Sequence, residues 1–329
     1  MQTGEGRGMV FLGRLLSLQV QPAQRVTWLG AAWAALCGAV ASGKLTLSGQ
    51  NLLSLGLALF LADPLLGAVW SALATLSRSA GSSRGEVHSS EASVQLPPLP
   101  YTQPGSASEG FFARLNASLT WWRAELWPRA GGALVGLVVA SALALAMGVI
   151  LGPWVALLVS AALVFPLLAA LFGHRPLRGP LPRALLEMGL AWLLGYAAFQ
   201  DLSFVRGEDV LASPLWASVL AWLGLHREPL LLAGLYTAVY YACLTLEGRG
   251  GLAQPLALLN GAQLAVAVIL VVIRQPVLAG LVGMLLISQA LFQPLLRRQG
   301  PHWYLQRTQF FLMGAMLAAA LGVAIRELR

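Results

Sequence analysis

The stretch LALFLADPLLGAVWS, residues 57–71, places an acid and a proline inside a long apolar run. An acidic side chain near the middle of a membrane-spanning helix costs about 2.5–3.5 kcal/mol on insertion scales, so Asp63 is by default a hypothesis for a functional site. A structural interpretation stands beside it. Pro64 frees a backbone carbonyl one turn earlier and kinks the helix, and a protonated Asp63 would bond within a helix bundle. The stretch itself leaves both interpretations open.

The composition of the whole chain places this stretch in a membrane. Of the 329 residues, 57% are hydrophobic and only 10% are charged, whereas a soluble domain carries about 25% charged residues. We therefore predict an all-α, polytopic membrane helix bundle. The net charge of +8 does not indicate nucleic-acid binding, because the positive residues cluster at the ends of the apolar runs.

Apolar runs of about 17–25 residues predict nine transmembrane helices. They cover roughly residues 26–44, 50–76, 130–150, 152–173, 183–202, 229–246, 256–273, 275–296 and 305–326. Residues 1–25 are expected to form a cytoplasmic N-terminus, and residues 26–329 a single membrane domain. A shorter run at 213–225 is expected to be a re-entrant or interfacial helix.

The distribution of positive charge predicts the orientation of these helices. With the N-terminus inside, 15 of the 21 Lys and Arg residues fall on the cytoplasmic side. The other six are Lys44, Arg206, Arg227, Arg274, Arg326 and Arg329. This bias predicts a cytoplasmic N-terminus, an external C-terminus and a location in a bacterial inner membrane.

Two segments of the longest cytoplasmic loop differ in character. Residues 77–108 are rich in Ser, Gly and Pro, which predicts a disordered insert. Residues 109–127 place Phe and Leu largely on one helical stripe and charged residues on other faces. This pattern predicts an amphipathic helix in the plane of the lipid headgroups.

Polar residues inside or beside the spans suggest local pairings. Glu187 follows Arg183 by one helical turn, a spacing suited to an ion pair. Asn260 and Gln263 are expected to bond a neighbouring helix rather than a ligand. The residues His302, Trp303 and Tyr304, at the start of the last span, are interpreted as an interfacial aromatic anchor.

The order of the spans resembles the UbiA family of membrane prenyltransferases. The resemblance covers about residues 22–326. It rests on nine spans with the N-terminus inside, on cytoplasmic loops after the second and sixth spans, and on the entry YLQRTQ (304–309) to the last span. Members of that family attach isoprenoid chains to aromatic or tetrapyrrole acceptors. The resemblance thus implies a UbiA-like fold and a prenyl diphosphate or another isoprenoid as ligand.

Family chemistry requires Mg²⁺, held by two acidic motifs, to neutralise the leaving diphosphate. Aligned on Asp63, the further ligands of the first motif correspond to Gly67 and Ser71, and the second motif retains Glu247 followed by Gly251. The resemblance implies Asp63 and Glu247 as catalytic and metal-binding residues, with one acid left in each motif.

The positive residues of the inner surface complete this hypothesis. The resemblance implies that Arg175, Arg178 and Arg249 bind the diphosphate, although arginines at this position would equally serve to set the topology. Glu247 beside Arg249 is likewise open to interpretation as a solvated acid at the membrane boundary.

Three functions remain as hypotheses. The first is a divergent prenyltransferase. The second is a non-catalytic membrane protein on the same scaffold that binds an isoprenoid lipid, quinone or pigment, or serves as a subunit of a membrane complex. The third is a transporter, ranked last because the chain shows no internal repeat and few intramembrane charges.

Overall fold

The computed structural model of the chain describes residues 30–70, 73, 127–171, 179–200, 227–247 and 252–328. Within these ranges the regular secondary structure is helical, as the sequence predicts. The chain divides into two compact units, residues 1–67 with 142–329 and residues 68–141. The described part of the second unit consists mainly of the first half of one helix, and all that follows concerns the first unit unless stated.

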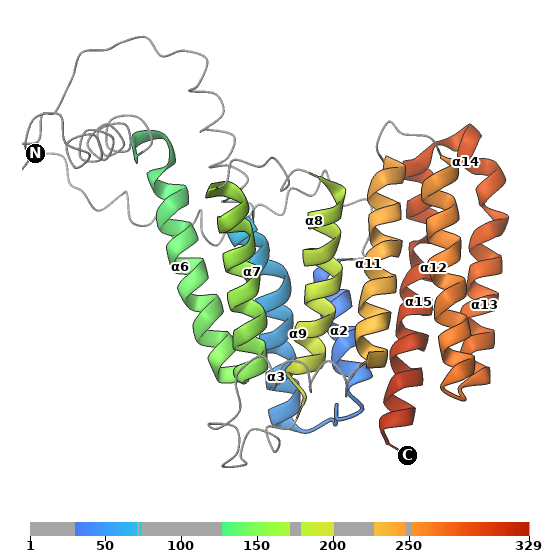
Figure 1. Cartoon of the computed structure of the whole chain (residues 1–329), viewed down its shortest axis with the longest axis horizontal. Coiled ribbons are helices and arrows are strands. Elements are labelled where there is room, and N and C mark those ends of the chain that lie inside the picture. The colour runs from blue at the N-terminus through green and yellow to red at the C-terminus, as the bar shows by residue number, and fades with distance from the viewer. Residues whose placement is uncertain are drawn as a thin grey trace, which may run out of the picture. The chain divides into compact units, whose positions relative to one another are not determined.

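The helices occur in the following order (Figure 1). They are α2 (Ala31–Ala41), α3 (Gly49–Phe60), η2 (Leu61–Leu65), α6 (Trp127–Leu151), α7 (Pro153–Leu171), α8 (Pro180–Ala184), η5 (Leu185–Leu190), α9 (Ala191–Ala197), α11 (Arg227–Glu247), α12 (Ala253–Val272), α13 (Pro276–Leu291), α14 (Gln293–Gln299) and α15 (Pro301–Glu327). Here η2 and η5 are π-helical turns that continue the helices before them.

Six helical segments in the described residues are long and apolar enough to cross a membrane. They are Gly49–Trp70, Leu134–Leu151, Arg227–Leu246, Ala253–Val272, Pro276–Gln299 and Pro301–Glu327. Each overlaps one of the nine predicted spans. The first and fourth predicted spans coincide with the shorter apolar helices Ala31–Ala41 and Pro153–Phe165, and the fifth coincides with α8, η5 and α9. Crossings by these three remain predictions, as does the UbiA-like arrangement.

Proline and glycine set several helix boundaries. Pro153, Pro276 and Pro301 are each the first residue of a helix, where the missing backbone N–H costs nothing. Gly152 and Gly300 precede two of them with φ of 132° and 88°, in a region that favours glycine. Short connections of this kind let consecutive apolar helices turn back on each other.

Helix α2 packs closely against α9 because small residues meet at their crossing. A Cβ added to Gly38 would collide with the backbone carbonyl of Trp192, and one added to Gly195 would collide with that of Ala35. Gly38 and Gly195 thus allow the backbones of α2 and α9 to approach closely. Small residues have the same effect in many pairs of membrane helices. Helix α2 also contacts α15, so the first and the last helix of the described residues lie side by side.

Helices α12, α13 and α15 are joined by buried side-chain amides. Gln263 donates a hydrogen bond to Gln289 at 2.7 Å, and Gln289 donates to the hydroxyl of Tyr304 at 3.1 Å. Nearby, Gln293 donates to Asn260 at 2.8 Å. The prediction that Asn260 and Gln263 bond a neighbouring helix is therefore confirmed. In an apolar medium such bonds orient helices that the hydrophobic effect alone would not hold in register.

Tyr304 corrects one expectation. Its side chain is fully buried and bonded to Gln289, so it is part of the helix contact and not of an interfacial anchor. The residues that precede the apolar run do not reveal that Tyr304, in the first turn of α15, is covered by neighbouring helices.

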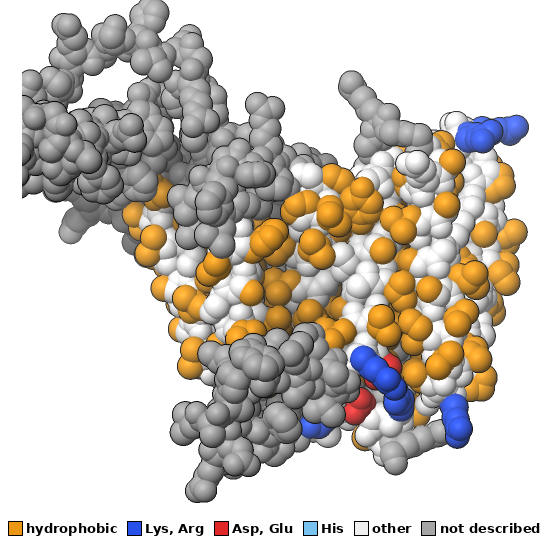
Figure 2. All heavy atoms as spheres, viewed as in Figure 1, with side chains coloured by type: hydrophobic (Ala, Val, Ile, Leu, Met, Phe, Trp, Pro, Cys, Tyr) orange, Lys and Arg blue, Asp and Glu red, His pale blue; other side chains and the backbone are white. Residues whose placement is uncertain are grey.

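The surface of the bundle is apolar along the helices. Figure 2 shows hydrophobic side chains over much of the visible face and charged side chains gathered at its ends. Val272, Val277 and Leu291 are 74%, 82% and 73% exposed. Apolar side chains at such exposure are typical of helices that face lipid.

Several predictions fall outside the described residues. These are the N-terminus 1–25, the insert 77–108, the amphipathic helix as far as residue 126 and the short run 213–225. The orientation in the membrane stays a prediction as well.

Candidate functional site

Asp63 lies in a π-helical turn, η2, together with Pro64. In this turn the backbone N–H of Leu66 bonds to the carbonyl of Leu61, five residues earlier. Proline has no N–H to donate and its ring clashes with the carbonyl four residues before it, so the α-helical pattern breaks here. The sequence therefore located this interruption correctly. Turns of this kind often occur at functional sites, and η2 packs against α2 and α9.

Glu187 occupies a second π-helical turn, η5, and holds two partners. Its Oε1 accepts a bond from Nε of Arg183 at 2.8 Å, which confirms the predicted pair. Its Oε2 accepts a bond from the hydroxyl of Tyr240 at 2.5 Å, which links η5 to α11. The side chains of Arg183 and Glu187 are 46% and 37% exposed, whereas Tyr240 is 5% exposed.

Close contact between η5 and α11 is possible because residue 189 is glycine. A Cβ at Gly189 would lie 2.6 Å from Oγ1 of Thr237. That hydroxyl is already committed, since it donates to the carbonyl of Ala233 at 2.6 Å. Thr237 precedes Tyr240 by three residues and therefore lies on a similar face of α11. Gly189 allows η5 to approach α11 closely, and the hydrogen bond between Glu187 and Tyr240 holds the same two segments together.

Two stacked aromatic rings continue this contact into the core. The rings of Trp192 and Tyr236 are 5.8 Å apart between centroids and inclined by 15°, and both side chains are fully buried. Neither the indole Nε1 of Trp192 nor the hydroxyl of Tyr236 has a hydrogen-bond partner in the part of the chain that the structure describes. We call Glu187, Trp192, Tyr236 and Tyr240 the aromatic seam.

The unpaired donors are the least expected feature of the seam. A buried polar group without a partner costs about 1–3 kcal/mol, and most buried polar groups in proteins are bonded. Tyr236 and Tyr240 are four residues apart on α11, so both face the same neighbour. The seam therefore presents a charged, partly exposed end at Glu187 and a buried aromatic end with hydrogen-bonding capacity.

The other predicted site residues fall largely outside the description. Arg175, Arg178 and Arg249 are not among the described residues, and Glu247 is described only as the last residue of α11. Position 247 follows Tyr240 by two helical turns, so the two positions share a face of α11. That Asp63 and Glu247 together bind a metal ion remains a prediction.

The magnesium site that the resemblance implies lies partly outside the described residues, because the side chain of Glu247 is not among them. Among them, no group of three or more His, Cys, Asp or Glu side chains could hold a metal ion. Mg²⁺ prefers octahedral oxygen coordination and is usually bound by carboxylates together with waters and phosphates. Asp63 is the one predicted ligand whose side chain is described, so the metal site remains a prediction.

Only a weak signal for the seam is present in the sequence. Met188 and Trp192, and likewise Tyr236 and Tyr240, are spaced by four residues, which places each pair on one helix face. Trp and Tyr in the middle of apolar spans also indicate a possible polar contact, because their N–H and O–H groups usually find a hydrogen-bond partner when buried. Nothing in either span alone, however, shows that the two faces meet.

No family model, curated protein or solved structure matches this chain.

Proposed function

We propose that this protein binds a lipid-soluble ligand with a flat, hydrogen-bond-accepting head, such as a quinone or another isoprenoid-tailed aromatic compound, at the aromatic seam. Six helices in the described part of the chain are long and apolar enough to cross a membrane, as expected of an integral membrane protein. The proposal concerns what that membrane protein does.

The observation that carries the proposal is the stacked pair with unpaired donors. The Nε1–H of Trp192 and the O–H of Tyr236 are buried without partners in the described residues. A quinone carbonyl or a similar acceptor would satisfy such donors. The two rings stack on each other, and a planar aromatic head group would extend this stack, which adds about 0.5–1.5 kcal/mol per pair.

The partly exposed end of the seam supports an amphipathic ligand. Arg183 and Glu187 are 46% and 37% exposed, so a polar head can approach from this end. The carboxylate of Glu187 can accept a further hydrogen bond because each oxygen offers more than one lone pair. The surrounding apolar helices would accommodate the tail.

Binding is tested with a purified detergent-solubilised protein and a short-chain ubiquinone analogue. We expect the analogue to quench tryptophan fluorescence with saturation, and Trp192→Phe and Tyr236→Phe each to weaken binding about tenfold, the effect of losing one hydrogen bond in an apolar site. Trp303→Phe on α15 is the matched control.

Stability separates a binding role from a structural one. Because Tyr236→Phe removes an unpaired buried donor and keeps the ring, this variant without ligand should be at least as stable as the wild type. Trp192→Phe also removes ring volume from a fully buried position, so it should lose stability whether or not the protein binds a ligand. A Tyr236→Phe protein that binds the analogue normally and unfolds more easily than the wild type would refute the proposal.

A parallel assay with Mg²⁺, a labelled prenyl diphosphate and an aromatic acceptor examines prenyl transfer. Turnover that is lost in Asp63→Asn would favour the divergent transferase over a protein that only binds its ligand.

A further inference from the structure

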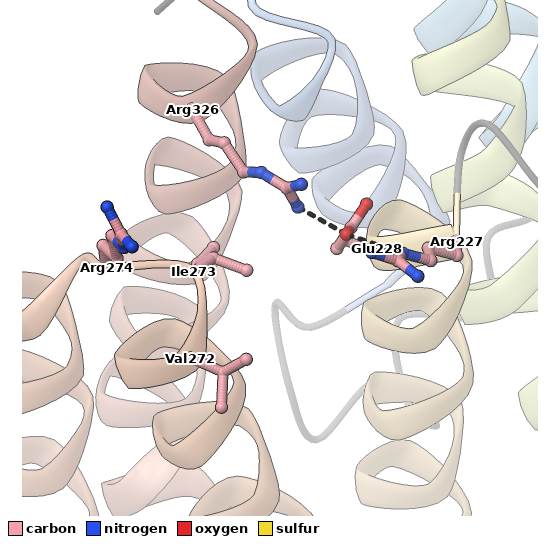
Figure 3. Close-up of a pocket in the computed structure, with 6 residues that line it drawn as sticks. All are labelled: Arg227, Glu228, Val272, Ile273, Arg274 and Arg326. Carbon is pink, nitrogen blue, oxygen red and sulfur yellow. Dashed lines mark hydrogen bonds and ion pairs between the residues drawn. The ribbon is translucent and has the colours of Figure 1, made fainter.

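The end of the bundle opposite to the charged end of the seam carries a pocket lined by three arginines. The pocket, of about 240 Å³, lies where the start of α11, the turn between α12 and α13 and the end of α15 meet (Figure 3). Its lining residues are Arg227, Glu228, Val272, Ile273, Arg274 and Arg326. Twelve residues of α11 separate Glu228 from Tyr240, a distance of about 18 Å along the helix, so the pocket is distinct from the seam.

One carboxylate serves two of the arginines. Glu228 is only 12% exposed and is paired with Arg326 of α15 and, at 3.1 Å, with Arg227. Figure 3 shows the guanidinium of Arg326 directed at Glu228. The pair ties the end of α15 to the start of α11. The six lining residues together carry two more positive than negative charges, and Glu327 beside Arg326 also interacts with its guanidinium.

Arg274 also lines the pocket, and no ion pair between it and an acid is found among the described residues. It lies on the other side of Ile273 from Glu228 in Figure 3. Its φ is 61°, and among the described residues that are not glycine it alone has a positive φ. Glycine would adopt this conformation without strain. The conformation closes helix α12 in a Schellman motif, in which the N–H of Gln275 bonds to the carbonyl of Leu270 and that of Arg274 bonds to the carbonyl of Val271.

The apolar part of the pocket lining, Val272 and Ile273, continues onto an exposed apolar surface. Val272 is 74% exposed, and Val268, Val271 and Val277 on the adjoining turns of α12 and α13 are 54%, 58% and 82% exposed. A guanidinium beside such a surface matches a molecule with a phosphate at one end and an acyl chain at the other. Arginine is well suited to phosphate because its planar fork can donate two parallel hydrogen bonds.

The geometry points to a binding site for the phosphate of an anionic phospholipid, with Arg274 and Arg326 around the phosphate and the acyl chains along Val272 and Val277. Phosphate on a lipid is favoured over free phosphate because the pocket adjoins the ends of membrane-spanning segments that the same lipid would contact.

The experiment uses the full chain in nanodiscs of phosphatidylcholine with increasing phosphatidylglycerol, with retained lipid counted by native mass spectrometry. We expect the wild type to retain phosphatidylglycerol in preference to phosphatidylcholine. Arg274→Gly should reduce this retention about tenfold, corresponding to one charged hydrogen bond, while Arg274→Lys should retain most of it.

The substitution to glycine is chosen because it relieves the positive φ, so loss of lipid would not reflect misfolding. Arg298→Ala on α14 removes an equal charge from an exposed position at another part of the bundle and is the matched control. Equal losses from the two variants would overturn the site in favour of general electrostatic attraction. Inorganic phosphate that displaces the lipid at equal concentration would overturn the assignment to a lipid.

Discussion

The two π-helical turns of this protein look alike but have different causes. Each interrupts an apolar helix and each contains an acid, Asp63 in η2 and Glu187 in η5. In η2 the cause is local, because Pro64 breaks the hydrogen-bond pattern wherever it is placed in a helix. The turn η5 contains no proline. Its distinguishing features are contacts with α11, namely Gly189 against Thr237 and Glu187 with Tyr240.

The difference shows that a π-helical turn can be caused by a residue of the turn itself, as in η2, or by contacts with a neighbouring helix, as in η5. If so, substitutions in α11 should alter η5 and leave η2 unchanged, and removal of Pro64 should do the reverse. Three substitutions separate the two cases, in order of decreasing effect.

The largest effect is expected from Gly189→Ala. The added Cβ would lie 2.6 Å from Oγ1 of Thr237, whose rotation would break its bond to Ala233. Overpacking of this kind costs about 1–3 kcal/mol. Loss of folded protein on heating in detergent can be followed by thiol labelling, because Cys37 and Cys243 are both buried in the folded protein.

Gly67→Ala is the matched control beside η2. A Cβ at Gly67 would meet nothing within 4 Å, and alanine favours a helix over glycine by about 1 kcal/mol. Gly67→Ala should therefore keep or raise stability, and Thr237→Ala should rescue Gly189→Ala. Equal destabilisation by the two alanines would contradict a contact-imposed turn at η5.

A smaller effect is expected from Tyr240→Phe, which removes the hydroxyl that bonds to Glu187. Hydrogen bonds to charged groups contribute about 1.5–3 kcal/mol. Glu187 is 37% exposed, so solvent would replace part of this and we expect a loss of about 1 kcal/mol. Hydrogen exchange at residues 185–190 should speed up, with residues 61–66 unaffected.

Tyr241→Phe, on the next position of α11, is the control, because no hydrogen bond of its hydroxyl is found among the described residues. Faster exchange at 185–190 in this variant too would mean that the response does not depend on the Glu187 bond.

The smallest effect on stability is expected from Pro64→Ala. Alanine restores an N–H that can bond to the carbonyl of Phe60, but the surrounding contacts are adapted to the wider turn, so the change should stay below about 1 kcal/mol. Exchange at residues 61–66 should become slower while residues 185–190 stay as they are. Unchanged exchange at 61–66 would show that neighbouring helices, and not Pro64, maintain η2.

Much of the fold was predictable because its signals are local. The hydropathy of the chain predicted the six segments long and apolar enough to cross a membrane, the spacing of Arg183 and Glu187 predicted their pair, and Pro64 marked the break in its helix. Each of these follows from neighbours within one or two turns, where helix geometry fixes which residues meet.

The partners across helices were decided by the tertiary structure alone. Glu187 bonds to Tyr240, which is 53 residues away, and Trp192 stacks on Tyr236 from another helix. Arg227, Arg274 and Arg326 come from three separate places in the chain. In a soluble protein an amphipathic pattern would show which face of each helix is buried. Here the helices are apolar on nearly every side, so the sequence determines that they form and enter a membrane, and only packing determines which faces meet.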